Sequence, residues 1–176
     1  MARKVYLSFP TFAFAANEEL EFELIDKVAK FFDVPFVGVQ IIGSAKTGFS
    51  LVKNTPFDCI ISDLDIALVD RDLFSKYWEI AFQRSEGFSV GGFQISGQPQ
   101  KKADERRKRF LGFLQKGIIN PELFPQCIER SELEVHLQSL SLGYSAYFSK
   151  ISAFIYASET FFEAKQVDAI NHYWYK

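Results

Sequence analysis

The sequence is poor in the residues that build zinc centres and disulfide scaffolds. It contains 2 cysteines and 2 histidines among 176 residues, and they have no metal-binding spacing. Cys59 and Cys127 are too few for a disulfide framework, and Cys59 stands in an apolar run. We therefore expect two reduced, buried thiols and a cytoplasmic protein. His136 and His172 are isolated, and no Ser/His/Asp constellation can be recognised.

The sequence also lacks long apolar runs and a strong excess of charge. No apolar stretch approaches the roughly 20 residues that span a bilayer, so we expect no membrane insertion. The net charge of −2 provides no general attraction to nucleic acid. Residues 1–16 resemble a weak signal peptide, but Pro10 and nearby polar residues interrupt the apolar stretch. We interpret this segment as an extended arm or an edge strand.

Phenylalanine is abundant, with 20 copies. A chain of this length can form a single domain over residues 1–176 and bury roughly 70% of its unfolded surface. The phenylalanines therefore predict an aromatic core. The alternative is an exposed surface for a protein partner, because aromatic side chains are enriched at interfaces.

Hydrophobic periodicity and capping residues predict an α+β fold. Asn17 is the expected N-cap of a helix over 18–32, and Asp70 or Asp72 caps a helix that follows a strand. The other expected elements are a strand over 36–42, a strand over 58–69, a strand or loop over 87–98, a helix over 101–116, a helix opened by a Ser131–Glu134 capping box, a strand over 151–156 and a helix over 159–173. This order indicates a mixed sheet flanked by helices.

Two carboxylates stand close together in the second expected strand. Asp63 and Asp65 are two residues apart, so they share one face of an extended strand, while Leu64 and Ile66 face a core. Neighbouring carboxylates repel each other and lose solvation when they are buried. A bridging cation resolves both problems, and oxygen ligands of this kind suit Mg²⁺, which also binds substrate phosphates.

The acidic pair and its surroundings resemble the DNA polymerase β-like nucleotidyltransferase superfamily. The shared pattern is a strand, a Gly-Ser pair that opens a helix, and a second strand with Asp-x-Asp. Here the strand 36–42 ends at Gly43-Ser44, and Asp63-Leu-Asp65 follows. The resemblance covers residues 18–75, with helical additions over 101–150. Eighteen residues separate Ser44 from Asp63, more than is typical of the family, and a surface loop can absorb them.

The resemblance implies a small mixed sheet of the nucleotidyltransferase type with added C-terminal helices. It implies Mg²⁺-dependent transfer of a nucleoside monophosphate from a nucleoside triphosphate to a hydroxyl of a protein, RNA or small molecule. Asp63 and Asp65 would hold two Mg²⁺ ions. Gly43, Ser44, Lys46 and Ser62 would bind the nucleotide. Small stand-alone members of this superfamily often work beside a partner protein, including in toxin–antitoxin and defence pairs.

The third carboxylate that this superfamily commonly places on a later strand has no obvious counterpart. The strand expected over 151–156 contains no acidic residue. The candidates are Glu159, just past that strand, and Glu134. If neither reaches the pair, the chain is a non-catalytic interaction module on the same fold.

Two further stretches of the sequence nearly match known phosphate-handling motifs. Gly43 and Gly48 have the glycine spacing of a P-loop, but Phe49 replaces the lysine that contacts phosphates, which excludes a standard P-loop NTPase. Residues 60–65 also resemble the nucleophile strand of the haloacid dehalogenase superfamily, which implies a phosphatase as an alternative. In that family Gly-Thr normally follows, whereas Ile66-Ala67 follows here.

A basic run over 101–109 contains six basic and two acidic residues. One interpretation is a solvated helix face with internal ion pairs. The other is an anion-binding surface in which Arg106, Arg107 and Arg109 contact the triphosphate or an acceptor RNA.

Overall fold

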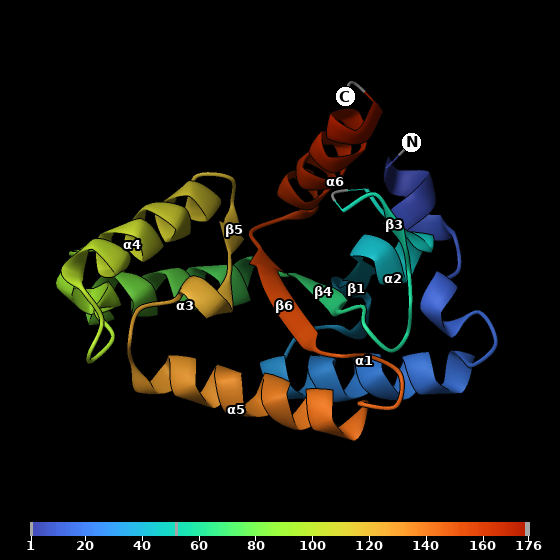
Figure 1. The fold of residues 1–176 in the computed structure, drawn as a ribbon, viewed down its shortest axis with the longest axis horizontal. Helices are drawn as coiled ribbons and strands as arrows, with labels where there is room; N and C mark the ends of the chain where they lie inside the picture. Colours follow the sequence, from blue (N-terminus) through green and yellow to red (C-terminus); the bar gives the residue numbers. More distant parts are fainter. Residues whose placement is uncertain (1, 52, 175–176) are drawn as a thin grey trace.

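A mixed four-stranded sheet lies at the centre of the computed structural model, which describes residues 2–51 and 53–174 (Figure 1). Its strand order is β1 (Val39–Ile42), β4 (Leu64–Val69), β6 (Ile151–Tyr156) and β5 (Ile118–Ile119). β4 runs antiparallel to β1 and parallel to β6, and β5 runs antiparallel to β6. Strands β2 (Phe49–Ser50) and β3 (Thr55–Pro56) form a separate antiparallel pair. The prediction of an α+β fold with a mixed sheet is confirmed.

Six α-helices surround the sheet within the described residues. They are α1 (Glu18–Phe32), α2 (Gly43–Thr47), α3 (Arg71–Arg84), α4 (Gln100–Leu114), α5 (Ile128–Gly143) and α6 (Glu159–Trp174). Shorter helical turns are η1 (Lys4–Ser8), η2 (Phe12–Phe14), η3 (Phe36–Gly38), η4 (Gly91–Phe93) and η5 (Pro121–Leu123). Figure 1 shows α1 and α5 along the lower edge of the view, α3 and α4 on the left, and α6 beside the N-terminal segment at the top. None of the described helices is long and apolar enough to cross a membrane.

The two faces of the sheet carry separate groups of buried side chains. Leu64, Ile66 and Leu68 of β4 point to the larger core, which α1, α3, α4 and α5 supply. Ala67 points to the opposite face, where a smaller core joins η1 and α6 through Tyr6 and Phe162. This alternation follows from the two-residue period of a strand. Asp65 belongs to the second face.

The phenylalanines divide between core and surface, so the prediction of an aromatic core is only partly correct. Buried members are Phe14, Phe32, Phe93, Phe110, Phe124, Phe148 and Phe162. Exposed members are Phe9, Phe12, Phe22, Phe31, Phe36, Phe82 and Phe161. Several exposed rings pack against one another, as Phe22 does with Phe36 at 5.5 Å between ring centroids.

The predicted starts of two helices are confirmed by their caps. The Leu20 N–H donates to Asn17 Oδ1 over 3.3 Å at the start of α1, which spans the predicted range. The Leu73 N–H donates to Asp70 Oδ1 over 2.7 Å at the start of α3. In both cases a side chain satisfies an N–H group that has no partner within the helix.

The strand prediction over 58–69 is wrong in its first half. Residues 58–62 form a turn, in which the Asp58 N–H donates to Ser62 Oγ over 3.0 Å and the Ile60 N–H donates to Asp58 Oδ1 over 2.8 Å. Local hydrogen bonds of this kind compete with strand formation. Cys59 is consequently exposed rather than buried in a strand.

Three other predicted elements differ from the structure. The N-terminal arm contains the helical turn η1 instead of extended chain, because Tyr6 packs edge-on against Phe162 at 6.3 Å. The strand predicted over 36–42 begins only at Val39, after η3. The capping box is also wrong: α5 begins at Ile128, so Ser131 lies within the helix, and Glu134 pairs with Arg130 at 2.6 Å. Residues 87–98 form a loop that contains η4.

Candidate functional site

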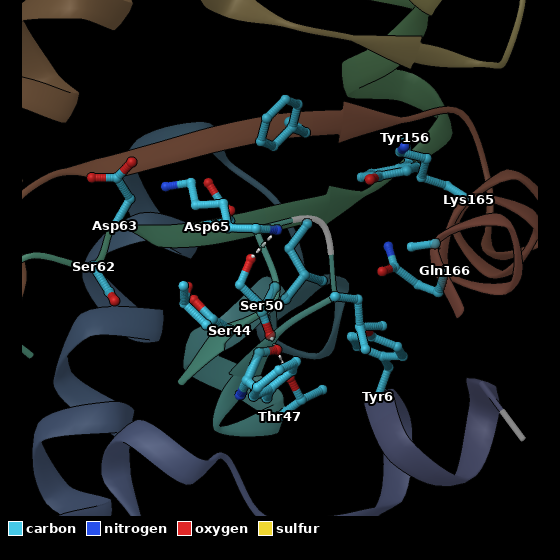
Figure 2. A pocket seen from close by; sticks show the side chains of 18 of the residues that line it. Tyr6, Ser44, Thr47, Ser50, Ser62, Asp63, Asp65, Tyr156, Lys165 and Gln166 are labelled. Carbon is cyan, nitrogen blue, oxygen red and sulfur yellow. Dashed lines mark hydrogen bonds between the residues drawn. The ribbon is translucent and has the colours of Figure 1, made fainter. Parts of the chain in front are cut away.

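A cavity of about 340 Å³ opens on the sheet face that carries Asp65 (Figure 2). Residues from distant parts of the chain line it: Gly43 and Ser44 of α2, Asp63 and Asp65 around the start of β4, Phe154 and Tyr156 of β6, Lys165 and Gln166 of α6, and Tyr6 of η1. Its volume lies within the roughly 300–1,000 Å³ typical of small-molecule sites. Ser50, Leu51, Lys53 and Thr55, from the segment after α2, also line it.

Gly43 and Asp65 meet because β1 and β4 are neighbours. Ile42, the last residue of β1, pairs with Asp65 in the antiparallel register, and Gly43 follows directly. Gly43 has a φ of +66°, and a Cβ placed on it would lie 3.0 Å from Asp65 Oδ2. Both the backbone conformation and the close approach therefore favour glycine at this position.

Asp63 and Asp65 both line the cavity, as their spacing predicts. Leu64 between them is completely buried on the opposite face. Asp63 precedes β4, and its Oδ1 accepts a hydrogen bond from Ser149 Oγ over 2.7 Å. Asp63 is therefore held in place by the loop that leads into β6.

The negative charge of Asp65 is only partly compensated by the positive charges near it. Burial, and next the neighbouring Asp63 carboxylate, raise the pKa of Asp65 from 3.8 to about 6. The Lys53 ammonium opposes this rise, and Glu122 adds to it from across the sheet. A cation near Asp63 and Asp65 would reduce this repulsion, so these two carboxylates are the residues that could hold a metal.

Lys46 and Ser62, both predicted to bind nucleotide, make local contacts. Lys46 Nζ donates to the Phe9 carbonyl over 2.7 Å and to Thr11 Oγ1 over 3.4 Å, and burial lowers its pKa. Lys46 thus ties the N-terminal segment to α2 and is not among the residues that line the cavity. Ser62 lines the cavity while its Oγ accepts the Asp58 N–H.

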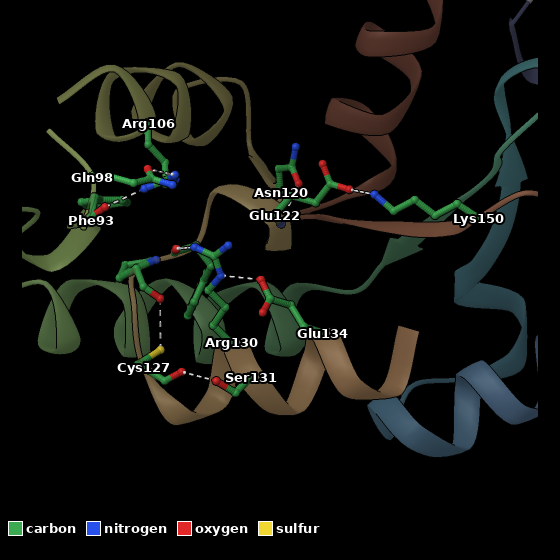
Figure 3. A network of polar contacts seen from close by, with 12 residues as sticks. Phe93, Gln98, Arg106, Asn120, Glu122, Cys127, Arg130, Ser131, Glu134 and Lys150 are labelled. Carbon is green, nitrogen blue, oxygen red and sulfur yellow. Dashed lines mark hydrogen bonds and ion pairs between the residues drawn. The ribbon is translucent and has the colours of Figure 1, made fainter. Parts of the chain in front are cut away.

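The candidates for the third carboxylate lie elsewhere. Glu159 lines a separate hollow with Leu7 and Phe162, and Glu134 pairs with Arg130 on α5 (Figure 3). The β6 residue opposite Asp65 is Ser152. Within residues 2–51 and 53–174, no group of three or more His, Cys, Asp or Glu side chains is placed to hold a metal.

Glu122 is the acidic residue whose field reaches Asp65 from the far side of β6. It lies on η5, directly after β5, and forms an ion pair with Lys150 (Figure 3). Its charge is therefore largely matched within the protein, and it does not line the cavity.

The basic residues of α4 lie apart from the cavity. Arg106 donates to the Phe93 carbonyl over 2.8 Å and to Gln98 Oε1 over 3.3 Å (Figure 3). Arg107 donates to the Phe88 carbonyl, and Arg109 is exposed. Two of these three arginines thus bind the glycine-rich loop 87–98, and none of them lines the cavity.

Sequence reasoning missed most of the side chains that line the cavity, among them Tyr6, Lys53, Tyr156, Lys165 and Gln166. Tyr156 could have been found from the sequence, because the predicted strand 151–156 has the observed bounds. Tyr156 lies on the same face of this strand as Ser152, which pairs with Asp65. Tyr6 and the α6 residues carry no such signal, since only the packing of the two chain ends brings them to the sheet.

Comparison of the sequence with protein-family models found no match, and comparisons with curated proteins and with solved structures found none either.

Proposed function

We propose that this chain is a Mg²⁺-dependent nucleotidyltransferase. It would move a nucleoside monophosphate from a nucleoside triphosphate to a hydroxyl of a protein, an RNA or a small molecule. The observation that carries the proposal is the meeting of Asp63, Asp65 and Gly43 at one end of an open cavity. The mixed sheet supports it, because a strand that ends in Gly-Ser lies beside the strand that carries Asp-x-Asp.

The side chains present fit one Mg²⁺ ion held by Asp63 and Asp65. Magnesium commonly binds through one or two carboxylates and completes its shell with substrate phosphates and water. The raised pKa of Asp65 shows that its negative charge is poorly compensated within the protein. When bound, the ion would neutralise phosphate charge and polarise the phosphorus–oxygen bond that breaks. The second ion implied by the family pattern would need ligands from the substrates.

The chain's own groups would hold and orient the triphosphate. The absence of a Cβ at Gly43 lets a phosphate approach the backbone, and Ser44 offers a hydroxyl donor. Lys53 lines the same cavity and takes the role of phosphate neutralisation that the sequence assigned to Lys46. At neutral pH Asp65 is mostly ionised, so it can serve as an anionic ligand.

The dehalogenase-like alternative is disfavoured by the direction of β4. In open α/β sheets, ligands bind outside the carboxyl ends of the strands. Here Asp63 precedes β4 and Asp65 is its second residue, so both lie at the amino end. β4 also pairs antiparallel with β1 rather than lying between two parallel neighbours.

The second candidate is a non-catalytic interaction module, the partner protein of a toxin–antitoxin or defence system. It is favoured by one observation: neither Glu134 nor Glu159 lines the cavity beside the acidic pair. Exposed rings such as Phe9 and Phe12 would then contribute to a partner surface. Such a module would bind a nucleotide without turnover.

Pyrophosphate release from each of the four ribonucleoside triphosphates separates the two candidates. The wild type with Mg²⁺ should release pyrophosphate and label itself or an added RNA. Asp65→Asn should lower the rate by at least about 100-fold, because the metal loses an anionic ligand. Asp72→Asn, on the exposed side of α3, is the matched control. Nucleotide binding without pyrophosphate release from the wild type would identify the module instead.

A further inference from the structure

We propose that the α6 end of the cavity selects a nucleobase with a carbonyl oxygen at C6 of a purine or C4 of a pyrimidine. Guanine and uracil have this oxygen, whereas adenine and cytosine have an amino group at the same positions. The inference rests on the proposed function, since it names the base of the triphosphate bound at Asp63 and Asp65.

The cavity continues from the carboxylates to α6 through Tyr156. Burial raises the pKa of Tyr156, and the Asp65 carboxylate and the Tyr6 phenol raise it further. The Tyr156 side chain thus interacts electrostatically with both groups. Figure 2 shows Tyr156, Lys165 and Gln166 together at the end opposite Asp63, with Tyr6 below them. A ligand that reaches both ends would place its triphosphate at one and its base at the other.

The walls of the α6 end are suited to a flat ring. Phe113, Phe154 and Ala169 are among the apolar residues that line the cavity. Aromatic and aliphatic side chains bind the faces of all bases with little preference, so they supply affinity without choosing the base. The choice between bases must therefore come from polar side chains that contact the edge of the base.

Gln166 provides one polar group that needs a ligand. Only 5% of its surface is exposed, and its Nε2 has no hydrogen-bond partner in the part of the chain that the structure describes. Its amide interacts with the Tyr156 phenol and lowers the pKa of that phenol, while no acceptor stands in hydrogen-bond geometry to Nε2. A buried donor without a partner is rare in folded proteins. Nε2 is enclosed in the free protein, so a base acceptor in the cavity would supply a partner once the amide turns toward it.

Lys165 determines which nucleobase edge can bind beside Gln166. An amide alone can donate through its nitrogen or accept through its oxygen, so Gln166 by itself suits either class of base. Lys165 lines the same end of the cavity, and its ammonium can only donate. Two donors at one edge match O6 and N7 of guanine, which both accept, or the O4 carbonyl of uracil. An amino group at that position would meet a second donor, which penalises adenine and cytosine.

The test is calorimetric titration of the full chain with GTP, UTP, ATP and CTP at a fixed excess of Mg²⁺. The wild type should bind GTP or UTP at least about tenfold more tightly than ATP and CTP. The comparison of GTP with UTP decides between the purine and the pyrimidine. Lys165→Met should reduce this preference by at least about threefold, and Gln166→Glu, which replaces a donor with an acceptor, should reverse it. Lys101→Met on α4 and Gln83→Glu on α3 are exposed controls with the same changes in charge and should keep the wild-type order.

Equal binding of the four triphosphates by the wild type, or tighter binding of ATP or CTP, would overturn the inference. An unchanged preference in Lys165→Met would overturn it as well. Lys165 is only half-buried, so this variant should fold and provide the test even if Gln166→Glu does not fold. If the four triphosphates bind equally and Asp65→Asn abolishes binding, only the base selection is wrong. If none of them binds, the proposed function fails too.

Discussion

Asp65 stands in a position that is unfavourable for an isolated carboxylate. Its side chain is largely buried, lies beside the backbone of Gly43, and feels the negative charges of Asp63 and Glu122. Lys53 and Lys150 compensate only in part, and the pKa stays at about 6. Residues that cost stability in this way concentrate at functional sites. The same features that destabilise the free protein would favour a bound cation.

We expect Asp65→Asn to stabilise the metal-free protein at pH 7.5. The rise of the pKa from 3.8 to about 6 corresponds to roughly 3 kcal/mol of unfavourable ionisation energy in the folded state. Because the folded pKa is raised, stability from this group is fully present below pH 3.8 and is lost as the pH rises through about 6. The gain from Asn should therefore be about 2–3 kcal/mol at pH 7.5 and close to zero near pH 4.

Urea unfolding of both proteins at the two pH values, with a chelator present, measures this difference. A gain of the same size at pH 4 and pH 7.5 would show that packing, rather than ionisation, is responsible. A loss of stability at pH 7.5 would contradict the electrostatic description of Asp65.

Gly43→Ala should destabilise the protein more than Gly97→Ala does. Both glycines have positive φ angles, +66° and +77°, so both substitutions carry a backbone penalty of about 1 kcal/mol. Only at Gly43 would the new Cβ meet a neighbour, Asp65 Oδ2 at 3.0 Å, whereas nothing lies within 4 Å at Gly97. Thermal unfolding of both variants, alone and combined with Asp65→Ala, isolates the contact. Equal costs in the two single variants would mean that Gly43 and Asp65 do not touch.

At the scale of single residues, the sequence supported the carboxylate end of the cavity better than the α6 end. The spacing of Asp63 and Asp65 placed both on one face, and the order of Gly43 and Asp65 placed them near each other. Lys46 shows the limit of such reasoning: its position after Gly-Ser suggested a phosphate ligand, but the Phe9 carbonyl binds its ammonium. That contact depends on how the N-terminal segment packs, which no local pattern encodes.

At the scale of elements, α4 is a support for the loop 87–98. Its arginines reach back to carbonyls of that loop, Arg106 to Phe93 and Arg107 to Phe88. Phe88 has a φ of +61°, a conformation that a bulky residue rarely adopts, so the loop needs such contacts. The cationic run therefore has a structural role that its composition did not reveal.

Arg107→Gln should lower the free energy of unfolding by about 1–3 kcal/mol, because the Phe88 carbonyl loses a charged donor. Nucleotide binding should change little, since Arg107 is not among the residues that line the cavity. Arg109→Gln, in the same helix but exposed, is the control and should leave both properties nearly unchanged. The measurements are urea unfolding and triphosphate titration at two salt concentrations. A variant of normal stability with weaker, less salt-dependent binding would restore the anion-binding interpretation of α4.

Elements with strong local signals were predicted well. Asn17 and Asp70 cap helices where a cap was expected, and β6 has its predicted bounds. The errors arose where two local signals compete. Residues 59–61 look apolar enough for a strand, but Asp58 and Ser62 form the hydrogen bonds of a turn. Ser131 and Glu134 match a capping box, yet α5 begins one turn earlier.

At the scale of the whole molecule, the cavity is formed by both ends of the chain. η1 and α6 pack together on the sheet face opposite the larger core, and Arg3 forms an ion pair with Glu163 beside them. The motif core around α2 and β4 supplies the carboxylates, and the two chain ends supply Tyr6 and Gln166. Contacts between segments so distant in sequence cannot be read from periodicity, which explains why the sequence predicted the carboxylate end of the site and not the α6 end.

The central claim is that Asp63 and Asp65 bind a divalent cation together with a nucleoside triphosphate. The most direct measurement is a titration with Mn²⁺, a paramagnetic substitute for Mg²⁺, followed by electron paramagnetic resonance with a non-hydrolysable triphosphate present. The wild type should bind Mn²⁺ with the triphosphate at pH 7.5 and less well below pH 6, where Asp65 becomes protonated. Asp65→Asn should reduce the affinity at least about tenfold, and Asp72→Asn should not. Equal Mn²⁺ affinity of the wild type and Asp65→Asn, or no binding by the wild type, would contradict the claim.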